Sequence, residues 1–271
     1  MRIACFADEI SPRFSDQLRV MEELNIHWMD LRSCWDIPVL QLNRHQIADI
    51  RDMAADKGIC VSCVSTAIGK ESIAAPPETA LEQLRVAAQT AHMCGAGYVR
   101  IFSYYPGETP RPQARSEAMK RLSHLAEIAC QEDIVLVLES AKVTTCGAGW
   151  ETAELLSQVN SAHLRAVMDP AAFVAAGELP LTQSLPQIAP YLEYVHIKDS
   201  RFGQKERFVA GEGDAQVAQI LDTLRERDDL FISLEPHLSY AGPAGGFSGE
   251  VPFRKAHSAL IQIMNQQGIS Y

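Results

Sequence analysis

The chain has 271 residues, of which 47% are hydrophobic, and a formal net charge of −10 at pH 7. A chain of this size can bury a core without disulfides or metal staples, and its acidic balance argues against the basic surface that nucleic-acid binding needs. No run approaches the ~18 apolar residues of a membrane span. We therefore expect a globular protein with a small-molecule partner, and neither a nucleic-acid nor a membrane partner.

The first ten residues, MRIACFADEI, read as a strand and carry no secretory signal pattern. The seven cysteines have no framework spacing, which favours a reducing compartment, so we expect a cytoplasmic location. Cys60 and Cys63 form a CxxC motif, but residues three apart on a strand point to opposite faces. We interpret them as structural thiols rather than as a redox pair.

Short apolar runs rich in β-branched residues alternate along the chain with longer amphipathic segments. The amphipathic segments include 45–58, for which Gly58 is a plausible C-cap, and 116–133. The expected strands are 2–7, 28–33, 59–65, 98–104, 134–140, 164–170, 194–200 and 230–236.

Eight strand–helix units spaced about 30 residues apart predict an all-parallel sheet covered on both sides. Eight is also the number that closes a barrel, so we predict an α/β protein with a (β/α)8 TIM barrel that takes up residues 1–271 as a single domain. A doubly wound open sheet is the alternative. It is disfavoured because FADEISPRF, and no glycine-rich phosphate turn, follows the first strand.

The last four predicted strands each carry a metal-ligand residue type at or near the C-terminal end, where barrel active sites lie. Three carboxylates and one imidazole at one point would repel each other without a compensating cation or protons. Taken singly, such residues are as often helix caps, turn residues or core histidines. Together they predict one divalent-metal site, suited to Mn²⁺, Mg²⁺ or Co²⁺ with Zn²⁺ possible. They are Glu139, Asp169, His196 and Glu235.

The contexts of these residues resemble the sugar phosphate isomerase/epimerase family of the xylose isomerase-like barrel superfamily. In order, they read VLES, MDP, VHIKDS and SLEPH, with GEGD (211–214) after the seventh strand. The resemblance covers essentially the whole chain. It implies that the four positions bind one metal ion, for which we expect Mn²⁺, and that Glu139 and Glu235 also exchange protons with the substrate.

The implied activity is that of a metal-dependent isomerase or epimerase acting on a ketose or keto-sugar. Such an enzyme moves a proton at the carbon α to a carbonyl through an enediolate, whose charge the metal stabilises. The chain departs from some relatives at Ala172, where they have His or Asn, and at Ser140 and Ala141, where many have Asn-His. These departures leave the four metal positions complete but put the identity of the sugar in doubt.

Several further polar residues near the same strand ends are predicted to bind substrate. Lys198 shares a strand face with His196, and His237 shares one with Glu235, so both side chains should point inward. Structural salt bridges are the alternative for the charged members of this group, and Glu9 and Tyr104 are weaker candidates. Asp199, on the opposite face, should orient a neighbour or cap the next turn. The predicted substrate-binding residues are Lys198, His237, Arg201, Arg100 and Arg32.

The stretch 239–253 is the most glycine-rich in the chain and has no Lys or Arg before Arg254. We interpret it as a lid or a subunit contact rather than a phosphate grip, and we expect a homo-oligomer, either a dimer or a tetramer.

Three other functions compete with the isomerase. A lyase, either a dehydratase or a decarboxylase, could use the same metal site on a keto-sugar acid or ketocyclitol. An apurinic endonuclease would need extra histidines, but strands 59–65 and 98–104 end in VS and SY. A non-catalytic sugar-binding protein is disfavoured, because paired carboxylates beside a metal are costly to keep without chemistry.

Overall fold

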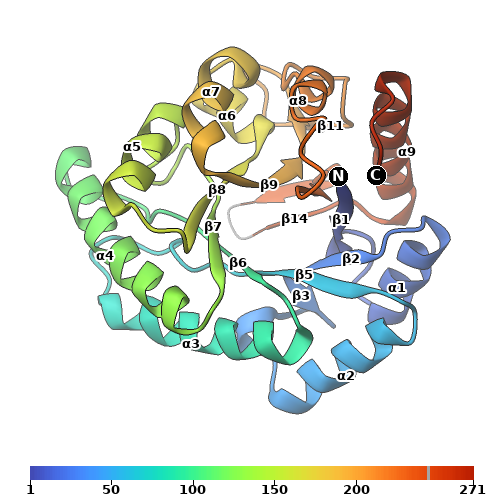
Figure 1. Cartoon of the computed structure of the whole chain (residues 1–271), viewed down its shortest axis with the longest axis horizontal. Coiled ribbons are helices and arrows are strands. Elements are labelled where there is room, and N and C mark those ends of the chain that lie inside the picture. The colour runs from blue at the N-terminus through green and yellow to red at the C-terminus, as the bar shows by residue number, and fades with distance from the viewer. Residues whose placement is uncertain (243–244) are drawn as a thin grey trace.

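Eight parallel strands close into a barrel at the centre of the molecule (Figure 1). The structure is a computed structural model that describes residues 1–242 and 245–271. Around the barrel the strands follow the order β1-β12-β9-β8-β7-β6-β5-β2, which confirms the predicted single-domain (β/α)8 TIM barrel. The barrel strands are β1 (Arg2–Phe6), β2 (Trp28–Leu31), β5 (Cys60–Ser65), β6 (Tyr98–Ile101), β7 (Val135–Leu138), β8 (Leu164–Met168), β9 (Leu192–Ile197) and β12 (Phe231–Leu234).

The helices form an outer ring around these strands (Figure 1). The predicted helix 45–58 is shorter than expected, because it ends at Ala55 and Gly58 lies in the following turn with φ +66°. The predicted segment 116–133 is the greater part of a helix that starts at Arg111. The α-helices are α1 (Phe14–Glu23), α2 (Arg44–Ala55), α3 (Pro77–Cys94), α4 (Arg111–Gln131), α5 (Gly149–Val159), α6 (Pro170–Ala176), α7 (Leu185–Ile188), α8 (Val217–Thr223) and α9 (Glu250–Gln267).

In the part of the chain that the structure describes, three short antiparallel hairpins and four helical turns complete the loops. The hairpin of β10 and β11 shows that the predicted strand 194–200 is two strands, which are separated at Lys198. The segment 239–253 contains the hairpin of β13 and β14 and the start of α9, while residues 243 and 244 of that segment lie outside the described residues. The hairpin strands are β3 (Ser33–Cys34), β4 (Ile37–Pro38), β10 (Asp199–Ser200), β11 (Arg207–Phe208), β13 (Tyr240–Gly242) and β14 (Gly245–Phe247), and the turns are η1 (Ala7–Glu9), η2 (Val39–Gln41), η3 (Pro180–Ser184) and η4 (Ala189–Tyr191).

Alternate residues of each barrel strand face the barrel interior and the helices. On β9, Tyr194 belongs to a small interior cluster and stacks on the Phe231 ring, with the centroids 5.4 Å apart. Its neighbours Val195 and Ile197 belong instead to the large core between strands and helices. This alternation decides which side chains at the ends of the strands can reach the barrel axis.

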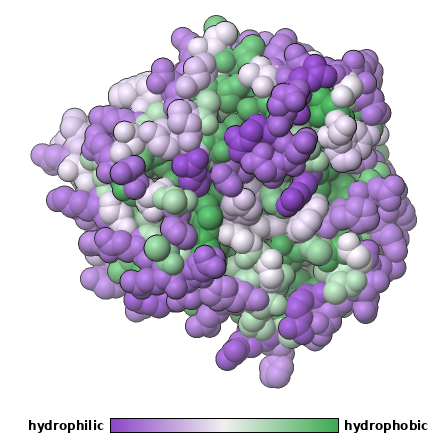
Figure 2. All heavy atoms as spheres, in the orientation of Figure 1, coloured by the Kyte–Doolittle hydropathy of each residue, from purple (hydrophilic) through white to green (hydrophobic). Residues whose placement is uncertain are grey.

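The surface and the cysteines agree with a reduced globular chain. Hydrophilic side chains dominate the edge of the face shown in Figure 2, and paler, more hydrophobic ones gather towards its centre. All seven cysteines are free, and Cys60 is exposed while Cys63 is buried, so the CxxC is not a disulfide.

The two ends of the chain meet where the Met1 amino group donates to the Ser270 carbonyl, at 3.2 Å. None of the helices in the described ranges combines the length and apolar character needed to cross a bilayer.

Candidate metal centre

The four predicted metal ligands leave four consecutive strands of the barrel, β7, β8, β9 and β12. Glu139, Asp169 and His196 each lie two residues beyond a side chain of the same strand that faces the barrel interior. Glu235 lies four residues beyond the interior residue Phe231, with Ser233 between them. Strand alternation therefore turns all four towards the axis. The interior residues are Val137, Val167 and Tyr194, and the side chains that follow them are Glu139, Asp169 and His196.

The structure brings these four side chains together into one buried group. One ligand atom from each of Glu139, Asp169, His196 and Glu235 lies within 4.8 Å of the others, and every side chain is buried. Nδ1 of His196 lies 3.2 Å from Oε2 of Glu235 and 3.5 Å from Oε2 of Glu139. Neither ring nitrogen has a hydrogen bond of acceptable geometry in the described residues. An imidazole nitrogen aimed at carboxylate oxygens, without a good hydrogen bond to them, fits shared coordination of a divalent cation.

The ammonium of Lys198 lies among the same carboxylates. Its Nζ is 2.9 Å from Oδ2 of Asp169, 3.1 Å from Oε1 of Glu139 and 2.6 Å from Oε2 of Glu235. The Lys198 side chain therefore points towards the barrel axis as predicted, while its role in substrate binding stays a prediction. Lys198 offsets part of the negative charge of the cluster, so a divalent cation bound there would face a nearby positive charge.

Arg100 and Arg32 also reach this cluster, and each is paired with a glutamate. One guanidinium nitrogen of Arg100 donates to Oε2 of Glu139 at 2.8 Å. Arg32 donates from one nitrogen to Oε1 of Glu235 at 3.2 Å and from Nε to Oδ2 of Asp8 at 2.8 Å. Both arginines thus make the buried salt bridges that charged residues in apolar strands require.

These contacts set the protonation of the cluster. Burial alone would raise the pKa of Glu139, but the charges of Lys198 and Arg100 outweigh it and hold that pKa well below its usual range. The pKa of Glu235 is likewise lowered, because Lys198 and His237 outweigh burial and the charge of Glu139. Burial opposes the charged form of His196, yet the two glutamates raise its pKa to about 9. Both glutamates are therefore carboxylates at neutral pH, whereas His196 is protonated in the metal-free protein and would have to lose a proton to coordinate a metal ion.

His237 is held against the cluster by Glu9. Nδ1 of His237 is hydrogen-bonded to Oε1 of Glu9, and its backbone N–H donates to Oε2 of Glu9 at 3.0 Å. Its other ring nitrogen, Nε2, lies 3.4 Å from Oε1 of Glu235. His237 has φ +52°, and its ring packs against Gly246, where an added Cβ would lie 2.1 Å from the ring. Both residues are thus positioned at the edge of the centre.

Arg201 is the one predicted substrate-binding residue that is directed elsewhere. Its side chain is exposed and donates from Nε and Nη2 to the Glu212 carbonyl, at 3.1 and 2.8 Å, while its guanidinium packs on the Phe208 ring. Arg201 therefore braces the loop after β9.

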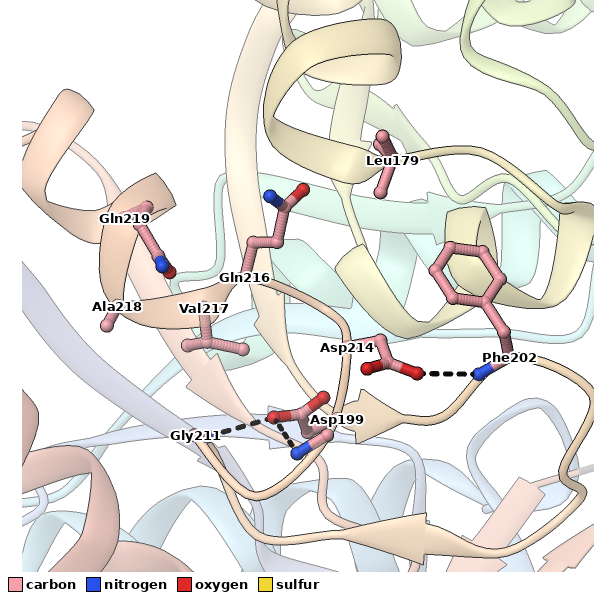
Figure 3. A pocket seen from close by; sticks show the side chains of 10 residues that line it. Leu179, Asp199, Phe202, Gly211, Asp214, Gln216, Val217, Ala218 and Gln219 are labelled. Carbon is pink, nitrogen blue, oxygen red and sulfur yellow. Dashed lines mark hydrogen bonds between the residues drawn. The ribbon is translucent and has the colours of Figure 1, made fainter.

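Asp199 anchors the same loop, as its predicted capping role requires. Its carboxylate accepts from four backbone N–H groups, those of Ser200, Gly211, Gly213 and Ala215, at 2.8 to 3.0 Å. A cavity of about 410 Å³ opens beside it, and Figure 3 shows two hydrogen bonds of its wall, which Asp199 accepts from Gly211 and Asp214 accepts from Phe202. None of the four metal-centre side chains is among the described residues that line this cavity, and its two carboxylates are occupied by backbone donors. The chemistry of the molecule is therefore concentrated at the buried cluster.

Ser140 and Ala172, at which the chain differs from related sequences, both have structural roles. Ser140 turns away from the cluster and shares a 2.8 Å hydrogen bond with Thr152 of α5. Ala172 lies in the first turn of α6, where its backbone N–H donates to Oδ1 of Asp169 at 3.2 Å. Asp169 thus uses one oxygen as a helix cap and the other for Lys198. Asp8 was not among the predicted site residues, and its only signal in the sequence is its place just after the first strand.

The comparisons with known proteins agree with this architecture. The family model described as xylose isomerase-like TIM barrel matches residues 18–257. No curated protein matches the chain.

Solved structures share the fold at low sequence identity. A probable 3-DHS dehydratase, AsbF of Bacillus anthracis, is 18% identical with a TM-score of 0.76 over 98% of this chain and 100% of its own. The IOLI protein, solved with a zinc atom, is 18% identical with a TM-score of 0.78 over 98% and 99%. A D-allulose 3-epimerase from Methylomonas sp., solved with D-allulose, is 17% identical with a TM-score of 0.75 over 98% and 97%. Because its family match spans most of its length, this chain belongs to the xylose isomerase-like TIM barrel family.

Proposed function

We propose that this chain is a divalent-metal-dependent isomerase or epimerase that moves a proton at the carbon α to a carbonyl of a ketose or keto-sugar. The observation that carries the proposal is the buried group of Glu139, Asp169, His196 and Glu235, whose ligand atoms lie within 4.8 Å of one another. The fold that the chain shares with a D-allulose 3-epimerase supports the same class of reaction.

The four side chains would hold one metal ion, with Mn²⁺ the first choice and Mg²⁺, Co²⁺ or Zn²⁺ as alternatives, because the donor set has three carboxylates and one imidazole. Such an ion supplies Lewis-acid stabilisation of the charge that develops on the substrate oxygens. Asp169 and His196 act as ligands only in this proposal.

Glu139 and Glu235 act as the proton carriers. They leave β7 and β12, which are three places apart around the barrel, so their carboxylates approach the centre from different directions. One glutamate, as the carboxylate, removes the proton on one side of the substrate carbon, and the other, once it has taken up a proton from solvent, delivers that proton from the other side. Since their pKa values are lowered, both are ionised at neutral pH and can act as bases.

The neighbouring cations orient the glutamates and the substrate. Arg100 and Arg32 fix Glu139 and Glu235 by the salt bridges described above. Lys198 and His237 donate to substrate oxygens in this proposal, because both lie beside Glu235. Arg201 is left out of it, since its guanidinium is bonded to the Glu212 backbone. The cytoplasmic location and the dimeric or tetrameric state remain predictions.

The proposal is tested by solvent exchange. The protein is incubated in D2O with Mn²⁺ and, separately, with ketoses, keto-acids and inosose, and deuterium at the α-carbon is followed by NMR. We expect Mn²⁺-dependent exchange with one of these classes, abolished by EDTA, together with a rearranged product. Loss of water or carbon dioxide from the substrate would instead establish a lyase. Absence of Mn²⁺ binding by calorimetry would refute the metal centre.

A further inference from the structure

Lys70 lies beside the metal centre and has no part in the roles assigned so far. Its Nζ is 4.2 Å from the centroid of the Phe102 ring, and the guanidinium carbon of Arg100 is 4.7 Å from the same centroid. Arg100 in turn donates to Glu139. A single aromatic ring therefore links Lys70 to the arginine that holds a proposed proton carrier.

The backbone fixes the position of Lys70. The N–H groups of Phe102 and Tyr104 donate to the carbonyls of Ile68 and Gly69, at 2.8 and 2.7 Å. Gly69 has φ +83°, and a Cβ there would lie 2.0 Å from the Phe102 carbonyl oxygen, so only glycine allows this close approach. Backbone hydrogen bonds thus hold the turn before Lys70 against the segment after β6, and this restricts where the Lys70 ammonium can lie.

Lys70 differs from the other cations of the centre because it has no anionic partner. Lys198, Arg100 and Arg32 each contact a carboxylate, whereas no carboxylate of the described ranges lies within 4.0 Å of the Lys70 ammonium. Burial, followed by the positive charges of Arg100 and Lys198, lowers the pKa of Lys70 to about 8, so the ammonium is still mostly charged at neutral pH. Contact with an aromatic face compensates only part of the cost of desolvating a charge.

We propose that Lys70 binds a negatively charged group of the substrate, a carboxylate or a phosphate, at the end of the molecule away from the reacting carbon. The inference rests on the proposed function and narrows its substrate to an acidic keto-sugar or a keto-sugar phosphate. The keto end of the substrate meets Glu139 and Glu235, and the anionic end neutralises an ammonium that has no carboxylate partner within the described residues.

Three probes that share carbons 1 to 5 of one ketose test this proposal: neutral D-fructose, D-fructuronate with a terminal carboxylate, and D-fructose 6-phosphate. Binding to the metal-free and the Mn²⁺-loaded protein is measured by calorimetry. We expect one charged probe to bind about tenfold or more tighter than D-fructose, as a charge-assisted hydrogen bond provides. The preferred probe tells a carboxylate substrate from a phosphate substrate.

The Lys70→Met variant should lose this preference while its affinity for D-fructose stays within about twofold. Lys70→Arg should keep most of it. The matched control is Lys57→Met, because Lys57 lies in the turn before β5 and pairs with Glu22 on the surface. Circular dichroism checks that each variant is folded.

A charged-probe preference that survives in Lys70→Met overturns the inference, and so does a wild-type protein that binds neither charged probe better than D-fructose. Failure of the proposed function gives a different result. In that case the Lys70-dependent preference is present, but no sugar exchanges deuterium at its α-carbon.

Discussion

The ammonium of Lys198 lies 2.6 Å from Oε2 of Glu235, a carboxylate that the proposed metal ion would also contact. The same ammonium contacts Glu139 and Asp169, so the protein cation and the proposed metal ion would share one set of negative charges. Two buried unit charges about 4 Å apart interact by roughly 4 kcal/mol at an effective dielectric of about 20. We therefore expect Lys198 to stabilise the metal-free protein and to weaken its affinity for a divalent cation.

Replacing Lys198 with methionine should make these two effects visible. We expect the metal-free variant to unfold at a lower temperature, because removing one partner of a buried ion pair typically costs about 3–5 kcal/mol. We also expect Mn²⁺ to bind it at least about tenfold tighter and to restore more of its thermal stability than it adds to the wild type. Calorimetry and thermal unfolding with and without Mn²⁺ provide the measurements.

Lys198→Arg, which keeps the charge, is the control for that experiment. If Lys198→Met bound Mn²⁺ no more tightly than the wild type, the ammonium would not compete for these carboxylates.

The fold and the four central side chains could be predicted from the sequence because both depend on short-range patterns. Alternation on a strand places Glu139 on the same face as Val137, and His196 on the same face as Tyr194. Once eight strands are counted, barrel closure brings such residues together. This prediction needs no information about contacts between distant segments of the chain.

The pairing of charges around the centre could not be predicted in the same way. The contact of Arg32 with Asp8 joins the ends of two strands through a loop, and its contact with the Gly246 carbonyl depends on the β13–β14 hairpin. Lys70 gave no sequence signal, because its position follows from backbone hydrogen bonds between the turn after β5 and the segment after β6. Such contacts depend on loop conformations that residue alternation does not determine.

Gly246→Ala should disturb the packing around His237 at the edge of the metal centre, because the new Cβ would lie 2.1 Å from the His237 ring. We expect a loss of about 1–3 kcal/mol in the free energy of unfolding, as is typical of overpacking, together with weaker substrate binding. Urea titration gives the stability change. Gly97→Ala is the matched control, since a Cβ there meets nothing within 4 Å, and it should leave stability within about 1 kcal/mol of the wild type. Equal effects of both substitutions would contradict the packing argument.

Asp30 should give the protein a pH-dependent stability in the acid range. It accepts hydrogen bonds from Ser65, Ser233 and Tyr194 inside the barrel, and burial raises its pKa despite the opposing charge of His196. Since the folded state favours the protonated form, the contribution of Asp30 to stability is complete below its unfolded pKa and is lost as pH rises through the folded pKa. The free energy of unfolding of the wild type minus that of Asp30→Asn should therefore fall as the pH rises above about 4, the ordinary pKa of an aspartate. A difference that rises over this range in urea titrations would show that the ionised form is the one stabilised.

Glu139→Gln and Glu235→Gln should separate the two proton carriers from the two simple ligands. Each substitution keeps the side-chain volume and removes the base, and the loss of one positioned base typically costs about 10²- to 10⁴-fold in rate. At saturating Mn²⁺, we expect both variants to lose net conversion. If the glutamates act from opposite sides of the substrate carbon, each variant should still exchange deuterium into one epimer only, and the two variants should retain opposite epimers.

Asp169→Asn should instead lose metal affinity, and excess Mn²⁺ should restore exchange into both epimers. Should all three variants recover fully with excess Mn²⁺, the glutamates would be ligands without a proton-transfer role, and another residue beside Glu235, such as Lys198 or His237, would have to carry the proton.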